Sequence, residues 1–201
     1  VCALLLLMGS ACENTPDASP VITTTIDPTV IIAETAIDYD KDGNEEKLIV
    51  RMVTGEVKEE KEPGPLSGAY WEGEFRLELV ANDGALLHAL DLNPTFGSGP
   101  LTFAQNRDFD ISFEDYNNDG QPDFSIGQYA SSNGFTYNLY SLMLEGIAVI
   151  HQDLFSADSK YSILYEKAGN TSFKNRFYDM DKGTYTDTLF TWQGEQFVRT
   201  E

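Results

Sequence analysis

Short apolar runs that alternate with glycine-containing or acidic turns most constrain the fold of this chain. They are rich in β-branched and aromatic residues, which favour strands. Asn82-Asp83-Gly84 separates two of them and predicts a hairpin, because these residues tolerate positive φ. The runs are EKLIVRMV, FRLELV, FDISFEDY, DFSIGQYA, FTYNLYSLML, IAVIHQDL, NRFYDM, TYTDTLFTW and EQFVR.

The segments between these runs complete the prediction. Residues 56–68 are charged and then broken by Pro63 and Pro65, which is typical of an exposed loop. Residues 156–167 are the one segment that suggests a short helix. We therefore predict a mainly β domain of antiparallel hairpins, in a partial propeller-like or stacked-sheet arrangement.

A weak internal repeat is visible within this pattern. IDYDKDGNEEKLIV, which contains Asp38, aligns with EDYNNDGQPDFSIG, which contains Asp115, at an offset of 115 − 38 = 77 residues. In both copies oxygen-bearing side chains stand at alternate positions, a glycine follows the third, and an apolar run comes next. Alternate residues of a tightly wound loop can turn their oxygens toward one centre, so each copy is a candidate cation loop.

Calcium is the cation that suits such a loop. It takes six to eight oxygen ligands in flexible geometry, whereas magnesium demands a tight octahedron and gives up water reluctantly. Gly43 and Gly120 stand where the chain must turn sharply. An EF-hand would need a glutamate at loop position twelve, where this chain has Ile49 and Ile126. The loops are therefore expected to lead into strands.

The pattern D-x-[DN]-x-D-G-x-x-[DE] before an apolar strand resembles the calcium loops of FG-GAP and VCBS-type repeats, which occur in integrin-like propellers and bacterial surface proteins. The resemblance covers about fourteen residues in each copy. It implies as calcium ligands Asp38, Asp40, Asp42, Asn44 and Glu46, and Asp115, Asn117, Asp119, Gln121 and Asp123. A third acidic segment, with Asp179, Asp181 and Asp187, lacks the third acid before glycine and is predicted to be a hairpin turn.

The N-terminal sequence VCALLLLMGSAC has a short apolar run that ends in small residues, as a signal peptide does. Small residues directly before Cys12 resemble the lipobox of bacterial lipoproteins. The resemblance implies a signal at 1–11 and a lipid on Cys12. Residues 12–29 are rich in Thr, Pro, Ser and Asp and are predicted to form a tether, and residues 30–201 are predicted to form the β-rich domain. The lipobox resemblance places the protein at the extracytoplasmic face of a bacterial cell membrane. The alternative is an ordinary secretory signal with a chance cysteine.

Charge and the remaining residues limit the possible functions. A net charge of −20 repels nucleic acid and anionic lipid headgroups. His88 and His151 are isolated in strand-like runs and are expected to be packed sheet residues. Glu72 and Glu74 are two residues apart, so on a strand they would share one face, as a paired-carboxylate site requires. A solvated strand edge is the favoured interpretation.

These observations lead to one expected function and two alternatives. We expect a lipid-anchored, non-enzymatic extracellular domain with structural calcium and an interaction or adhesion role. Its partner would be a surface protein or a wall glycan. One alternative is a polysaccharide-acting enzyme or enzyme subunit whose acidic site is supported by calcium. The other is a sensor for which calcium is the signal.

Overall fold

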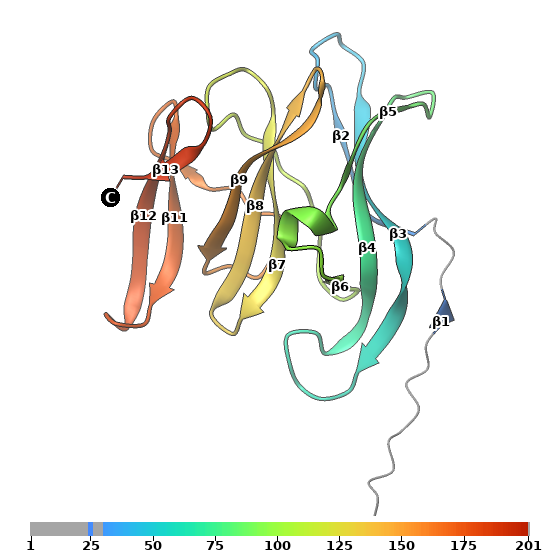
Figure 1. Cartoon of the computed structure of the whole chain (residues 1–201), viewed down its shortest axis with the longest axis vertical. Helices are drawn as coiled ribbons and strands as arrows, with labels where there is room; N and C mark the ends of the chain where they lie inside the picture. Colours follow the sequence, from blue (N-terminus) through green and yellow to red (C-terminus); the bar gives the residue numbers. More distant parts are fainter. Residues whose placement is uncertain (1–23, 26–29, 201) are drawn as a thin grey trace, which may run out of the picture.

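The computed structural model describes residues 24–25 and 30–200, which form three antiparallel sheets that follow one another across the molecule (Figure 1). The mainly β, stacked-sheet prediction is confirmed. The first sheet contains β1 (Thr24–Thr25), β2 (Ile31–Ile37), β3 (Glu46–Glu60), β4 (Gly68–Val80), β5 (Leu86–Asp91) and β6 (Leu101–Ala104), and a short 3-10 helix, η1 (Asn93–Phe96), lies between the last two. The second contains β7 (Asp123–Ser131), β8 (Gly134–Met143) and β9 (Gly146–Ser156), and the third contains β10 (Glu166–Lys167), β11 (Ser172–Asp179), β12 (Thr184–Trp192) and β13 (Phe197–Arg199).

The internal repeat of the sequence is also a repeat of structure. Ile37 pairs with Glu46 to close the hairpin of β2 and β3. Glu114 pairs with Asp123 in the second copy, and both closing residues are displaced by the same 77 positions (37 + 77 = 114; 46 + 77 = 123). The third sheet is also antiparallel, with four strands in sequence order. It has no acidic loop at the equivalent place, because residues 168–171 join β10 directly to β11.

One cluster of buried apolar residues has members in all three sheets. Phe103 of β6 lies edge-on against Phe75 of β4, with ring centroids 4.7 Å apart. Phe173 of β11 lies 4.9 Å from Phe197 of β13, and both rings are buried. Aromatic side chains bury about 150–250 Å² each and dominate the energetics of such a core. The sheets therefore share one core, which fixes the positions of the loops at their ends.

The predicted helix over residues 156–167 is wrong. After β9 ends at Ser156, the chain runs in an irregular conformation beside β7. The backbone N–H of Gly127 donates to the carbonyl of Tyr161 at 2.8 Å, and Ser125 Oγ donates to the carbonyl of Ile163 at 2.7 Å. The free edge of β7 gains partners in this way, and Tyr161 and Tyr165 are buried in the core. Tertiary packing outweighs the local helical signal.

Two strand boundaries also differ from the prediction. Residues 56–60 belong to β3 and pair with β4, so the exposed loop is confined to 61–67. Lys58 forms ion pairs with Glu56 and Glu72, and these opposite charges favour cross-strand pairing. Residues 109–116 do not form the predicted strand, and within this run only Glu114 pairs, through an isolated bridge to Asp123.

The predicted signal, residues 1–11, lies outside the described residues, as does the predicted tether over 12–29 except for Thr24 and Thr25. Those two residues form β1, which pairs with β3 opposite Val57 and Glu56. Across residues 24–25 and 30–200, no helix is long and apolar enough to cross a bilayer.

Candidate metal sites in two repeated loops

The two acidic loops occupy equivalent places and have the same backbone conformation. Residues 38–45 join β2 to β3, and residues 115–122 lead from the bridge at Glu114 into β7. The fourth residues, Lys41 and Asn118, have φ values of 61° and 60°. The sixth residues, Gly43 and Gly120, have φ values of 91° and 84°, which favour glycine. The shared sequence pattern therefore encodes a shared loop geometry.

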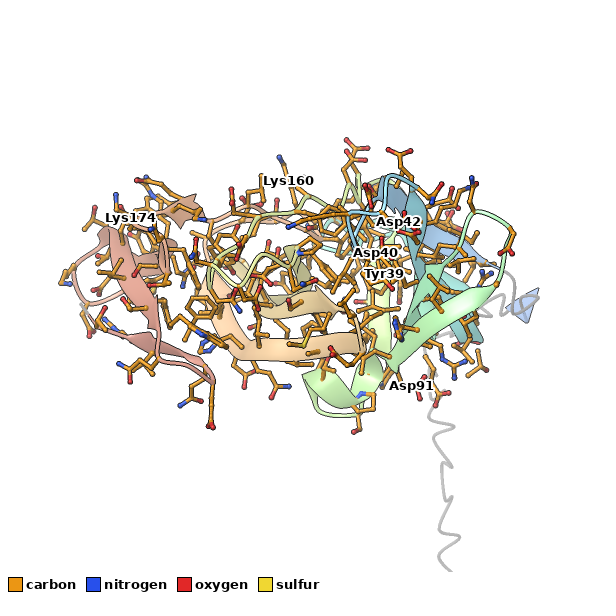
Figure 2. The ribbon with its side chains drawn as sticks, turned by 90° about the horizontal axis from the view of Figure 1, so that it is seen from above. Tyr39, Asp40, Asp42, Asp91, Lys160 and Lys174 are labelled. Carbon is orange, nitrogen blue, oxygen red and sulfur yellow. The ribbon has the colours of Figure 1, made fainter. Side chains whose placement is uncertain are left out.

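In the first loop the carboxylates turn inward and accept backbone hydrogen bonds. The N–H of Gly43 donates to Asp38 Oδ2 at 3.1 Å, and the N–H of Asn44 donates to Asp42 Oδ1 at 2.8 Å. One carboxylate oxygen each of Asp38, Asp40 and Asp42 lies within 4.8 Å of the other two. Figure 2 shows Asp40 and Asp42 close together, with Tyr39 beside them. Three predicted ligands are thus brought together.

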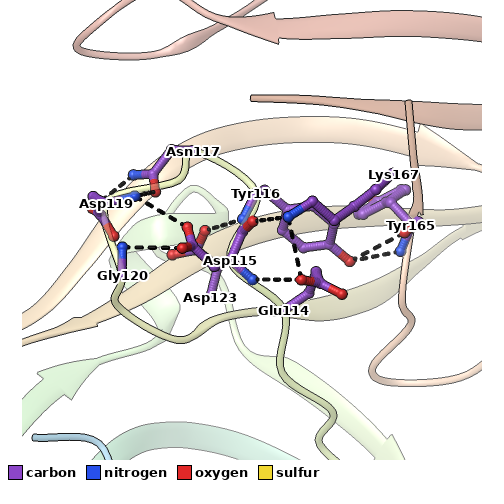
Figure 3. A network of polar contacts seen from close by, with 9 residues as sticks. All are labelled: Glu114, Asp115, Tyr116, Asn117, Asp119, Gly120, Asp123, Tyr165 and Lys167. Atoms are coloured by element: carbon purple, nitrogen blue, oxygen red, sulfur yellow. Dashed lines mark hydrogen bonds and ion pairs between the residues drawn. The ribbon is translucent and has the colours of Figure 1, made fainter. Parts of the chain in front are cut away.

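The second loop repeats this network (Figure 3). The N–H of Gly120 donates to Asp115 Oδ2 at 3.0 Å, as Gly43 does to Asp38. The N–H of Gln121 donates to Asp119 Oδ1 at 2.8 Å, as Asn44 does to Asp42. Asn117 Nδ2 donates to Asp119 Oδ2 at 2.8 Å. The N–H of Asp119 donates to Asp115 Oδ1 at 3.2 Å and to Asn117 Oδ1 at 3.1 Å, so the alternate side chains meet at this backbone. Among the described residues, a close group of three carboxylates is present in the first loop and not in the second.

The ninth position of each loop holds a buried acid. Glu46 is 7% exposed and Asp123 is fully buried. Burial raises the pKa of Asp123 to about 7, although Ser141 and the N–H of Tyr116 act in the opposite direction. Burial also raises the pKa of Glu46. Both carboxylates lie where a negative charge is unfavourable unless a positive partner is present.

Oxygens without hydrogen-bond partners are concentrated at the predicted ligands. Within the described part of the chain, seven buried side-chain oxygens have no partner. Four of them belong to the loops: Asp38 Oδ1, Glu46 Oε2, Gln121 Oε1 and Asp123 Oδ1. The hydroxyl of Ser141 lies near enough to Asp123 to affect its pKa but outside hydrogen-bond geometry. Buried polar atoms are nearly always paired, so these oxygens mark the places in the loops where a cation or a water molecule can bind.

The second residue of each loop anchors it to the core. Tyr116 is fully buried, its hydroxyl accepts a hydrogen bond of 2.8 Å from the N–H of Tyr165, and its ring lies 5.3 Å from that of Phe173. Tyr39 is buried and lies edge-on to His88, at 6.4 Å between centroids. Sequence reasoning assigned these tyrosines no role, although both copies carry one at the same position.

Two lysines complete the surroundings and were also missed. Lys41 Nζ, from the first loop, donates to the carbonyl of Gly120 in the second at 2.6 Å. Lys167 Nζ donates to the carbonyl of Asp115 and lies 3.3 Å from Glu114 Oε1. The two loops are therefore neighbours in space, which their sequence separation of about 77 residues did not reveal.

The other acidic candidates have ordinary partners. Asp179 begins the β11–β12 turn, where it accepts the N–H groups of Asp181 and Lys182 and pairs with Lys182 Nζ at 3.0 Å. Residues 180–183 form the turn between β11 and β12, as predicted, whereas Asp187 lies outside the turn, within β12 opposite Arg176. Glu72 is ion-paired with Lys58, as described for β3, and Glu74 is exposed.

The histidines are sheet residues packed against aromatic rings, as expected. His88 lies on β5 against Tyr39. His151 of β9 lies edge-on to Phe190 at 5.4 Å, and burial lowers its pKa. Neither histidine belongs to the group of loop carboxylates.

The donor set of both loops consists of carboxylate and amide oxygens, which fits a hard cation of the calcium type and not a soft metal. This arrangement can hold a cation, most directly at the grouped carboxylates of Asp38, Asp40 and Asp42. Comparison with protein-family models, curated proteins and solved structures finds no match to this chain.

Proposed function

We propose that this chain is a calcium-binding β domain in which each repeated loop holds one Ca²⁺. The observation that carries the proposal is the pair of buried, unpartnered carboxylate oxygens, Glu46 Oε2 and Asp123 Oδ1, at the same position of the two loops. The full ligand set is that of the sequence resemblance: Asp38, Asp40, Asp42, Asn44 and Glu46, and Asp115, Asn117, Asp119, Gln121 and Asp123. A bound cation would supply the positive partner that these buried carboxylates lack.

The metal would be structural, and the domain would serve interaction or adhesion rather than catalysis. Each loop is anchored through its tyrosine, so a cation there would stiffen the junction between strands and core. Glu72 is ion-paired with Lys58, so the Glu72 and Glu74 pair gives no support to the alternative of a polysaccharide-acting enzyme.

Calcium binding gives the direct test. We expect isothermal titration of the metal-stripped protein to report two calcium sites, because the two loops carry equivalent ligands. Asp42→Ala and Asp119→Ala should each remove one site. Asp179→Ala is the matched control and should leave both, because its carboxylate pairs with Lys182. Magnesium should bind more weakly, since the loops suit flexible oxygen coordination.

The titration should extend to several millimolar, because extracellular calcium modules commonly bind at about 10⁻⁴–10⁻³ M. If the wild type takes up no calcium in that range, the two loops are ordinary acidic turns. Equal stoichiometry in wild type, Asp42→Ala and Asp119→Ala would place any bound calcium elsewhere.

We further propose that Cys12 carries a lipid that holds the domain at the outer face of a bacterial membrane. The support is the sequence VCALLLLMGSAC, which lies outside the described residues. Acyl chains contribute about 0.8 kcal/mol for each buried methylene, so two or more anchor a protein stably. Cys12→Ser should therefore move the protein out of the detergent phase in a partition assay. Cys2→Ser is the control, and unchanged partitioning of Cys12→Ser would contradict the anchor.

A further inference from the structure

A groove lies at the end of the sheets opposite to the calcium loops. β7 starts at Asp123, directly after the second loop, and ends at Ser131, where the groove begins. The turns of β7–β8 and β11–β12 both point toward this end (Figure 1). The groove has a volume of about 600 Å³, within the usual range of ligand sites. Its lining includes Arg107, Tyr129, Asn133, Phe135, Asp158 and Tyr185.

Two exposed tyrosines flank the groove. Tyr185 is 55% exposed and Tyr129 is 38% exposed. The ring of Tyr185 is held by Tyr178, edge-on at 5.3 Å, and by the guanidinium of Arg176 at 5.3 Å. Tyr129 lies edge-on to Phe135 at 5.9 Å. The rings are thus fixed before any ligand arrives, which reduces the entropy lost on binding.

Arg107 holds the walls of the groove together. Its guanidinium lies over the ring of Phe135 at 4.9 Å and near that of Tyr161 at 5.5 Å. It donates to the carbonyl of Ser159 and, at 3.3 Å, to the carbonyl of Pro65. The arginine therefore connects the β3–β4 loop to the segment after β9, and its charge is directed to carbonyls and ring faces.

The remaining lining is small and polar and offers both donors and acceptors. Asn133, at the β7–β8 turn, donates from Nδ2 to Met180 Sδ at 3.3 Å and so links this turn to the β11–β12 turn. Asp158 is oriented by the N–H groups of Ser159 and Lys160, at 2.7 and 2.9 Å. Ser131 and Ser132 add hydroxyls to the same lining.

We propose that this groove binds an uncharged polysaccharide chain. Sugar rings present C–H faces that pack on aromatic rings, and hydroxyls that both donate and accept hydrogen bonds. Tyr129 and Tyr185 supply the first kind of contact, and Asn133 and Asp158 the second. A net charge of −20 disfavours an anionic glycan. The inference names a ligand for the proposed interaction role and does not depend on calcium, whose loops lie at the other end of β7.

The test is isothermal titration of the full chain with three neutral hexasaccharides: an α-1,4-glucan, a β-1,4-glucan and a β-1,4-linked N-acetylglucosamine oligomer. We expect at least one to bind, with and without chelator. Tyr185→Ala should weaken binding roughly tenfold, because an aromatic contact is worth up to about one power of ten. Leu144→Ala is the matched control, because Leu144 is 57% exposed and lies outside the groove lining.

Several results would overturn the proposal. One is the absence of binding by all three oligosaccharides at about 10 mM. Another is equal binding by wild type, Tyr185→Ala and Asn133→Ala, while circular dichroism shows that the variants are folded. Binding of oligogalacturonate but of no neutral oligomer would assign the groove to an anionic ligand. Failure of the calcium titration alone would leave the glycan result intact, so the two proposals can fail separately.

Discussion

Calcium is expected to raise the melting temperature of this protein by roughly 5–10 °C for each loop at a hundredfold excess over the dissociation constant. A ligand that binds only the folded state at that excess adds about 2.7 kcal/mol of stability. For a chain of this size, each kcal/mol corresponds to about 2–4 °C. Asp123→Asn should lose the contribution of the second loop, because it removes the buried carboxylate that lacks a partner at Oδ1.

In the presence of a chelator, the same substitution should raise the melting temperature instead of lowering it. At pH 8 the Asp123 carboxylate, whose pKa burial raises to about 7, is ionised and uncompensated in the metal-free protein. Asparagine removes that charge and keeps an oxygen for the N–H of Tyr116, 2.9 Å from the carboxylate, so the metal-free variant should melt higher than wild type. Thermal scans with and without calcium check both signs. Asp179→Asn should leave the calcium-dependent difference unchanged, whereas an unaltered difference in Asp123→Asn would contradict the assignment.

Gly73→Ala is expected to destabilise the domain by about 3 kcal/mol or more. Gly73 of β4 pairs with Gly55 of β3, beside the register shift between Met52 and Thr54. A Cβ at Gly73 would lie 2.1 Å from the carbonyl oxygen of Thr54 and 2.6 Å from the Cα of Gly55. Both are backbone atoms, so β3 and β4 would have to separate locally. The free energy of unfolding from urea titration measures the effect.

The control for this substitution is Gly64→Ala in the β3–β4 loop. No atom lies within 4 Å of a Cβ built there, so its free energy of unfolding should change by no more than about 0.5 kcal/mol. Similar free energies of unfolding for the two variants would mean that β3 and β4 pair less closely at Gly55 and Gly73 than the glycine contacts indicate.

Most of the strands and the turns of both loops could be predicted because their signals are local, whereas β2 and β6 were not predicted and residues 109–116 form no strand. The alternation of TYTDTLFTW predicts β12, and Asp-Gly at the fifth and sixth loop positions predicts the tight turn that Gly43 and Gly120 make. The 77-residue offset predicts the equivalence of the loops, and it also holds for their closing backbone pairs.

What the sequence did not predict depends on contacts between distant segments. The segment after β9 carries helix-compatible residues, but hydrogen bonding to Ser125 and burial of Tyr161 set its path. The groove combines Arg107, Tyr129 and Tyr185 from three separate segments, and no spacing rule connects them. Likewise, the charged residues 56–60 resemble a loop until Glu72 is placed opposite them.

The contact between Lys41 and Gly120 makes the two loops electrostatically unequal. The predicted ligands of the first loop include four carboxylates, on Asp38, Asp40, Asp42 and Glu46, whereas those of the second include three, on Asp115, Asp119 and Asp123. The second also has the ammonium groups of Lys41 and Lys167 at its backbone. Ligand charge tunes calcium affinity. If each loop holds the proposed Ca²⁺, we therefore expect the first loop to attract the ion more strongly than the second.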